Sequence, residues 1–123
     1  MISHVSIGVA DIEHSKRFYD AVFGALGYGR LFEGEGYVAY GADFPKFWVA
    51  QSEHVPAPNA GSGLHFCFNA PARAAVDAFH AAALASGGAD NGAPGLRPEY
   101  HASYYAAFAV DPDGWRIEAY HGG

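Results

Sequence analysis

The sequence predicts an α+β fold in which one unit, a strand followed by a helix and further strands, is used twice along 123 residues. Three observations support this prediction. Residues 2–9 and 63–69 alternate between apolar and polar side chains, as strands with one buried face do. Apolar residues at helical spacing follow each of these stretches. Near the end, two apolar runs flank the turn sequence DPDG at residues 111–114, which predicts an antiparallel hairpin.

The first half contains clear helix boundaries. Asp11 is a suitable N-cap, and an apolar stripe at helical spacing then continues to Leu26. Gly27 is a suitable stop, because glycine adopts the left-handed conformation that closes many helices. Glycine- and proline-containing turns divide the residues that follow. Three short strands are therefore expected near residues 28–32, 37–41 and 46–51.

The second half repeats this order after a connector. Residues 52–62 are rich in proline, alanine and small polar side chains, which is typical of a linker. Pro71 fits the first position of a second helix, and the glycine pair at 87–88 fits its end. Residues 89–103 are rich in glycine and proline and predict a long loop, with a short strand around 96–98.

The two halves match in register as well as in order. The same spacing separates three pairs of identical residues, which are His4 and His65, Phe18 and Phe79, and Gly27 and Gly88. We therefore expect a single domain over residues 1–123, with module one at about 1–55 and module two at about 62–123. His4 and His65 then occupy equivalent points of equivalent first strands.

Composition and charge exclude several classes of function. The net charge is −6 with only seven Lys and Arg, so nucleic acid and anionic membrane surfaces are poor partners. The single cysteine, Cys67, excludes an internal disulfide and suits a reducing compartment, and we interpret it as a small buried apolar residue. The sequence lacks both an apolar run of membrane-spanning length and a signal-peptide pattern, so a cytoplasmic location is expected.

Face parity brings together three side chains that can bind a metal ion. In the last strand Ile117 and Ala119 share the side that faces the helices, so Glu118 points to the opposite side, as His4 and His65 do. A carboxylate in the middle of a strand needs a basic group, N–H donors or a metal as its partner. Two imidazoles and a carboxylate suit a divalent metal and leave positions open for substrate. A strand histidine that only makes hydrogen bonds is the alternative for each of them.

The chain resembles the vicinal oxygen chelate superfamily, also called the glyoxalase/bleomycin resistance/dioxygenase family. The resemblance covers nearly the whole chain. It rests on HVSIGVAD around His4, SKRFYDAVFGALGY after it, GLHFCF around His65, and FAVDPDGWRIEAY around Glu118. It implies two βαβββ modules that form a cupped, mostly antiparallel sheet with helices on its outer face. It also implies one divalent metal ion (Fe, Mn, Ni or Zn) on His4, His65 and Glu118, and a homodimer.

One residue departs from the glyoxalase I pattern. Pairing residues 47–49 with residues 117–119 places Trp48 where glyoxalase I enzymes usually carry a fourth ligand. An indole cannot ligate a hard divalent ion. Three ligands are more similar to those of ring-cleaving, extradiol-type dioxygenases and of the metal-dependent thiol transferases that act on fosfomycin. The reaction subclass, a lyase or isomerase or a dioxygenase, stays open.

Further polar and aromatic residues are candidates for catalysis and substrate binding. His101 is a candidate acid or base near neutral pH, or a solvent-exposed loop residue. Tyr104 and Tyr105 are also catalytic candidates, but they lie on opposite faces of a regular strand, so only one should reach the site. Arg116 shares the parity of Glu118 and suits an anionic substrate group or a surface salt bridge. The candidates for substrate binding are Trp48, Arg116 and Tyr120.

Three functional hypotheses follow. The first is a metal-dependent enzyme that binds a small oxygenated substrate through two adjacent oxygens and stabilises the negative charge that develops on them. The second is a metal-free protein that sequesters a small molecule, as bleomycin-resistance members of the family do. The third is a scaffold whose cup is filled by its own side chains, for which Trp48 is the main support.

Overall fold

The computed structural model describes residues 1–55 and 61–123 and confirms the predicted α+β class, with two βαβββ modules. Residues 56–60 of the predicted connector lie outside the described residues. Module one contains β1 (Val5–Val9), α1 (Ile12–Leu26), β2 (Gly29–Gly34), β3 (Tyr37–Gly41) and β4 (Phe47–Gln51). Module two contains β5 (Phe66–Asn69), α2 (Arg73–Ala85), β6 (Ala89–Leu96), β7 (Tyr105–Val110) and β8 (Arg116–His121).

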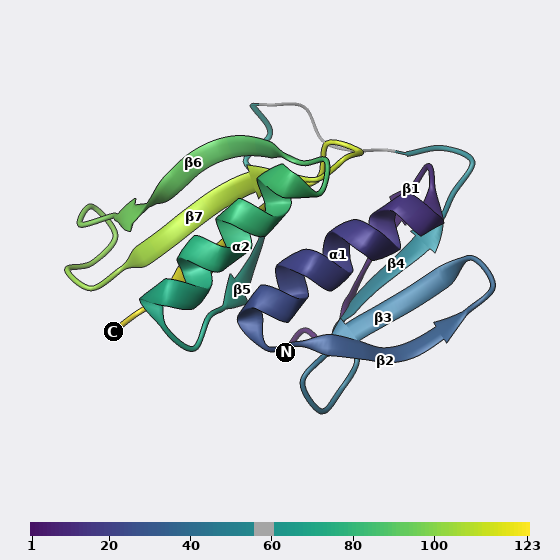
Figure 1. The fold of residues 1–123 in the computed structure, drawn as a ribbon, viewed down its shortest axis with the longest axis horizontal. Coiled ribbons are helices and arrows are strands. Elements are labelled where there is room, and N and C mark those ends of the chain that lie inside the picture. Colours follow the sequence, from purple (N-terminus) through teal and green to yellow (C-terminus); the bar gives the residue numbers. More distant parts are fainter. Residues whose placement is uncertain (56–60) are drawn as a thin grey trace.

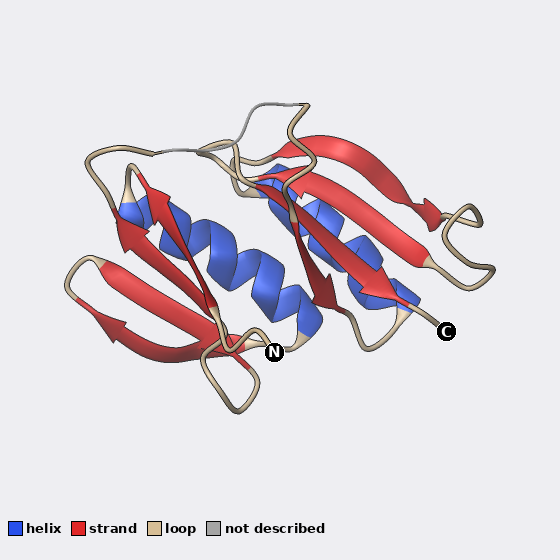
Figure 2. Ribbon diagram, turned by 180° about the vertical axis from the view of Figure 1, so that it is seen from behind, coloured by secondary structure: helices blue, strands red, loops and turns tan. Residues whose placement is uncertain are grey.

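Each module has its own four-stranded mixed sheet. The strand orders are β1-β4-β3-β2 and β5-β8-β7-β6, so the first strand of each module lies at an edge. That strand runs parallel to the last strand of its module, and the other pairs are antiparallel. The helices α1 and α2 pack against each other on one side of the sheets (Figure 1), and the strands lie in front of them in the opposite view (Figure 2). The open faces of both sheets point away from the helices.

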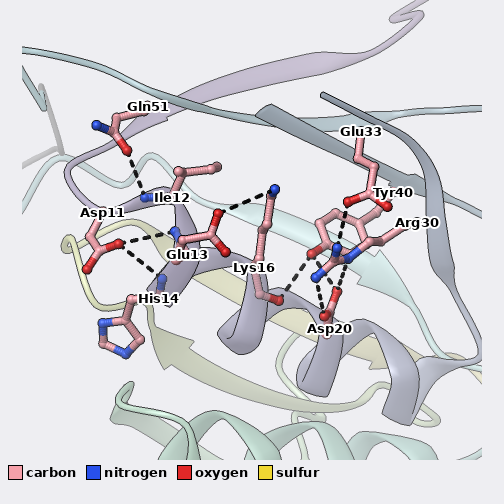
Figure 3. A network of polar contacts seen from close by, with 10 residues as sticks. All are labelled: Asp11, Ile12, Glu13, His14, Lys16, Asp20, Arg30, Glu33, Tyr40 and Gln51. Atoms are coloured by element: carbon pink, nitrogen blue, oxygen red, sulfur yellow. Dashed lines mark hydrogen bonds and ion pairs between the residues drawn. The ribbon is translucent and has the colours of Figure 1, made fainter. Parts of the chain in front are cut away.

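Helix α1 begins and ends where the sequence predicts. The Asp11 carboxylate accepts hydrogen bonds from the backbone N–H groups of Glu13 and His14, as an N-cap does (Figure 3). Gly27 closes the helix in the left-handed conformation, with φ of 86°. Neither helix in the described part of the chain is long and apolar enough to cross a membrane.

The hydrophobic core lies between the helices and the helix-facing side of the sheets. In module one Tyr19 and Phe23 of α1 pack against Phe47 of β4, with ring centroids 5.3 and 5.5 Å apart. In module two Phe79 of α2 and Ile117 of β8 are buried in the same core. Burial of each large apolar side chain stabilises the fold by roughly 1.5–3 kcal/mol. The apolar side chains of the strands therefore face the helices. The opposite face of each sheet is left free for function.

The turn between β7 and β8 fastens module two to module one. Asp111 accepts hydrogen bonds from the backbone N–H groups of Asp113 and Trp115, which fixes the turn. Three hydrogen bonds then cross to module one: Tyr19 Oη to Asp111 Oδ2 at 2.6 Å, Ala10 N to Asp113 Oδ1 at 3.2 Å, and Trp115 Nε1 to Gly8 O at 2.9 Å. The predicted hairpin is confirmed, and its turn is also a contact between the modules.

Two local predictions in module two are wrong. Pro71 is not the first helical residue, because α2 begins at Arg73 after an extended Ala72 N-cap. Residues 89–96 form the edge strand β6 rather than part of a long loop. The register of β6 against β7 shifts between Asp90 and Gly92 and again between Gly92 and Gly95. These irregularities accommodate the glycines and remove the alternation that identifies a strand in the sequence.

Candidate functional site

Glu118 is the buried polar centre of the open face of module two. It lies in the middle of β8, opposite Cys67 of β5 and Phe108 of β7, and is only 2% exposed. One carboxylate oxygen lies 2.9 Å from His65 Nε2. The other accepts a hydrogen bond of 2.5 Å from the Tyr104 hydroxyl. The structure thus gives Glu118 the basic partner that its position in a strand requires.

The ring of His65 is held between a backbone carbonyl and the Glu118 carboxylate. Nδ1 lies 3.1 Å from the carbonyl oxygen of Gly63, and a carbonyl can only accept, so Nδ1 carries a proton. Nε2 lies 2.9 Å from a carboxylate oxygen of Glu118. The two atoms are close enough to share either a proton or a metal ion. A backbone carbonyl that orients the ring is also typical of histidines that bind metals.

His4 is not part of this group in the single chain. It is exposed just before β1, with Nδ1 3.0 Å from Ser3 Oγ, and it contacts the edge of Trp48. The equivalence predicted for His4 and His65 holds, since each immediately precedes the first strand of its module. Across residues 1–55 and 61–123, no three His, Cys, Asp or Glu side chains lie close enough to hold a metal ion. His65 and Glu118 are therefore suitable as two ligands, and a third is not supplied by the described part of the same chain.

Trp48 occupies the position in module one that Glu118 occupies in module two. It pairs with Ser6 of β1, just as Glu118 pairs with Cys67 of β5. Its ring stacks with Phe32 and Tyr37 at centroid distances of 6.2 and 6.1 Å. Phe32 is 56% exposed and Tyr37 is 38% exposed. The open face of module one is therefore an aromatic surface, in contrast to the polar open face of module two.

His101 and Tyr120 extend the polar face beyond Tyr104. The backbone N–H of Ser103 donates to His101 Nδ1 at 3.2 Å, so the neutral ring carries its proton on Nε2. That nitrogen lies 3.0 Å from the Tyr120 hydroxyl oxygen, and the Tyr120 ring packs on Tyr104 with centroids 4.2 Å apart. His101, Tyr120 and Tyr104 thus form a connected group that ends at Glu118.

The two adjacent tyrosines point to opposite faces, as their parity predicts. Tyr104 faces Glu118, whereas the Tyr105 hydroxyl donates to Asp77 of α2 at 2.6 Å, on the helix side. The Arg73 guanidinium lies 5.1 Å from the Tyr105 ring centroid. Desolvation, followed by the hydrogen bond to Glu118 and its negative charge, raises the pKa of Tyr104. Tyr104 is therefore a hydrogen-bond donor at neutral pH, and Tyr105 does not reach the site.

A family model described as the Glyoxalase/Bleomycin resistance protein/Dioxygenase superfamily matches residues 1–119. The chain belongs to this superfamily. The paired βαβββ modules agree with the fold that the sequence motifs imply. No curated protein sequence matches the chain.

Solved structures of the superfamily extend this finding to the fold. A glyoxalase/bleomycin resistance protein from Albidiferax ferrireducens T118 is 37% identical with a TM-score of 0.84, and the match covers 97% of each chain. A glyoxalase/bleomycin resistance protein/dioxygenase family enzyme from Burkholderia phytofirmans PsJN is 21% identical, with a TM-score of 0.75 and coverage of 99% and 98%. A glyoxalase I mutant from Zea mays is 24% identical with a TM-score of 0.70, and the match covers 97% of this chain and 45% of that one.

The exposure of Cys67 contradicts the prediction that this residue is buried. It is exposed on the open face beside Glu118 rather than buried as a small apolar residue. Partial desolvation and the negative charge of Glu118 raise the pKa of its thiol to about 12, so the neutral thiol is the form at neutral pH. The alternation around GLHFCF already places Cys67 on the same face as His65. The strand face on which Cys67 lies therefore predicts its exposure better than the usual burial of cysteine does.

Two cavities border this part of the superfamily fold. The larger, of about 470 Å³, lies between the modules, with Val5 and Phe47 on one side and His65, Phe66 and Cys67 on the other. The smaller, of about 180 Å³, includes His65 and Arg116 among its lining residues. Because His65 borders both, a small molecule in either cavity can approach its ring. Because the His65 side chain is exposed and the Glu118 side chain is buried, a small molecule can reach the pair from the side of His65.

Proposed function

We propose that the chain is a metal-dependent enzyme of glyoxalase or dioxygenase type that acts on a small oxygenated substrate as a homodimer. In this proposal His65 and Glu118 of one copy and His4 of the other hold one divalent ion, which is Fe, Mn, Ni or Zn. The observation that carries the proposal is that His65 Nε2 and Glu118 Oε1, two atoms of metal-ligand type, lie 2.9 Å apart on the open face of module two. A shared site gives a role to His4, which precedes β1 just as His65 precedes β5 but belongs to the other module.

The surrounding residues have distinct roles in this proposal. When bound, the metal acts as a Lewis acid on two adjacent substrate oxygens. Tyr104 holds one oxygen of Glu118, and the other oxygen faces His65. His101 is the candidate acid or base, and the Tyr120 hydroxyl, 3.0 Å from its Nε2, lies between it and Tyr104. The aromatic surface around Trp48, contributed by the second copy with His4, excludes water from the site.

A metal-free binding protein is the second candidate, and the aromatic surface favours it. Phe32, Tyr37 and Trp48 form an exposed stacked group that suits a planar apolar ligand. In this alternative a proton between His65 and Glu118 replaces the metal, and both copies serve only to enclose the ligand. The His65–Glu118 pair is then structural.

Metal analysis of untagged protein, reconstituted without oxygen, distinguishes the two candidates. We expect about one equivalent of metal per chain in the wild type, and a loss of that metal in both His65→Ala and His4→Ala variants. His54→Ala is a matched control, because His54 lies outside the proposed ligand set. Wild-type protein that takes up no metal, yet binds planar aromatic compounds, would contradict the enzyme and support the binding protein. A screen of catechols, methylglyoxal–thiol adducts and fosfomycin then identifies the reaction.

A further inference from the structure

We propose that the smaller cavity holds an anionic group of the substrate, a carboxylate or a phosphonate, bound by Arg116. This inference rests on the proposed function, because it assumes that the oxygenated part of the substrate lies at His65 and Glu118. The cavity has a volume of about 180 Å³, which suits a group of this size rather than a whole cofactor. Among the described residues, its lining consists of Gly63, Leu64, His65, Asn91, Phe108 and Arg116.

Within residues 1–55 and 61–123, the charged side chain of Arg116 has no hydrogen-bond or ion-pair partner. It lies in β8 two residues before Glu118, so both side chains project from the same open face. Its Nε atom is buried and has no hydrogen-bond partner. Among the described residues, the hydrogen bonds and ion pairs do not include its guanidinium group. Arg30, in contrast, forms two hydrogen bonds to Asp20 and one to Glu33. Because no described residue accepts from the guanidinium group, a ligand in the cavity that Arg116 lines can do so.

The surroundings of Arg116 attract an anion in an otherwise acidic protein. None of the six lining residues is acidic, although the net charge of the chain is −6. Phe108, which forms one wall, lies beneath the Arg97 guanidinium at 5.5 Å from its ring centroid. Its ring also lies 6.1 Å from the ring of His65. One guanidinium group and one imidazole therefore line the cavity, and Glu118 is the nearby acidic group already paired with His65.

This arrangement defines a class of substrate. A guanidinium group binds carboxylate and phosphonate oxygens through two parallel hydrogen bonds, which fixes orientation as well as position. A molecule held by Arg116 at its anionic end presents its other end to His65 and Glu118, since His65 borders the same cavity. We therefore expect a small compound that carries both a pair of adjacent oxygens and an anionic group. Neutral dicarbonyls and neutral catechols should bind less well.

Isothermal titration with two matched probes tests the inference. Catechol and 3,4-dihydroxybenzoate share adjacent oxygens and differ by one carboxylate. We expect wild-type protein to bind the acid roughly tenfold or more tightly than catechol, and Arg116→Gln to abolish this preference. Arg116→Lys should keep part of it, because the charge remains and the paired hydrogen bonds do not. Arg17→Gln, which removes the same charge from the exposed side of α1, should leave the preference unchanged.

The titrations are made on chelator-treated and on metal-loaded protein, so that the anion site and the metal site are judged separately. A preference for the acid that depends on Arg116 in both forms supports the anion site even if no metal is required. Equal affinities for the two probes in the wild type, or a preference that survives in Arg116→Gln, would overturn it. Competition with acetate and with methylphosphonate distinguishes a carboxylate from a phosphonate ligand. Should Arg116→Gln fail to fold, the wild-type preference and the Arg116→Lys variant still decide the question.

Discussion

Tyr104 and Tyr105 are neighbours in sequence with the same side chain and opposite surroundings. The Tyr104 hydroxyl donates to Glu118, and the Tyr105 hydroxyl donates to Asp77 of α2. The two residues therefore offer a matched pair of substitutions, since each change removes one hydroxyl group and one hydrogen bond to a carboxylate. Only the first of these carboxylates belongs to the proposed metal site.

Tyr104→Phe should weaken metal binding by roughly 10- to 100-fold, the usual effect of removing a group that orients a ligand. Without the hydroxyl, one oxygen of the buried Glu118 loses its donor and the carboxylate loses its fixed orientation. Titration against a competing chelator measures the affinity. Tyr105→Phe should leave the metal affinity unchanged. Equal metal affinity in Tyr104→Phe and wild type would show that Glu118 does not depend on Tyr104 for its role.

The sequence predicts these single-residue features to different extents. The carboxylate of Glu118 in the middle of a strand indicates the need for a partner, and parity identifies His65 as a candidate. Parity also predicts that only one of the two tyrosines faces the site. It cannot say which, because that depends on where β7 begins and how it pairs with β8. The buried, unpaired Nε of Arg116 likewise becomes evident only when the packing around it is known.

At the scale of the elements, an ion-pair network holds β2 and β3 to α1. The Arg30 guanidinium donates to both oxygens of Asp20 at 2.8 and 2.7 Å, and the Tyr40 hydroxyl also donates to Asp20 at 2.8 Å (Figure 3). Desolvation opposes ionisation of Asp20, but the hydrogen bonds from Arg30 and Tyr40 outweigh it and lower its pKa. The ionised form of Asp20 therefore stabilises the folded state.

This lowered pKa predicts a pH dependence of stability. The contribution of Asp20 is fully present above its unfolded pKa of about 3.9, and it is lost as the pH falls through the lower folded value. Because the pair is partly exposed, Asp20→Asn should cost roughly 0.5–1 kcal/mol at pH 7, and the difference from wild type should vanish in strong acid. Urea unfolding at a series of pH values measures this. Glu35→Gln, in the exposed turn between β2 and β3, should give no such difference, and a pH-independent cost in Asp20→Asn would refute the explanation.

Regular elements are predictable from the sequence, and irregular ones are not. The caps and apolar stripe of α1 give its boundaries directly, because Asp11 and Gly27 act through local geometry. The hairpin of β7 and β8 is equally local. The strand β6 has no such signal, since its glycines and its shifts of register are stabilised by pairing with β7 along the whole edge. Non-local pairing of this kind overrides local propensity.

For the whole molecule, the repeat of one unit creates two open faces with complementary character. The face of module one carries His4 and an exposed aromatic group, and the face of module two carries His65 and Glu118. Strand parity in the sequence predicts which side chains lie on each open face. The expected fold, however, joins the two faces in a single cupped sheet. The structure has two sheets, with β1 and β5 each at an edge. Parity fixes the side of a sheet on which a residue lies, whereas the relative placement of two sheets depends on how α1 and α2 pack.

Mixing of two defective variants tests whether the faces combine between copies. His4→Ala and His65→Ala each remove one ligand from every site, so each alone should bind no metal. In a symmetric dimer with shared sites, a mixed dimer keeps one intact site, formed by His4 of the His65→Ala chain and by His65 and Glu118 of the His4→Ala chain. After unfolding, mixing in equal amounts and refolding, metal content should return to about a quarter of the wild-type value, because half of the dimers are mixed and each has one of two sites.

The same mixture made from His65→Ala and Glu118→Gln is the matched control, since both ligands come from one chain in the proposal. No mixed dimer then contains an intact site, and metal content should stay at zero. Size-exclusion chromatography of each protein establishes that dimers are present before and after mixing. Recovery of metal in the control, or its absence in the first mixture, would mean that His4 does not complete the site of the other copy. The contact of 2.9 Å between His65 and Glu118 would then be a hydrogen bond through a shared proton, as in the metal-free alternative.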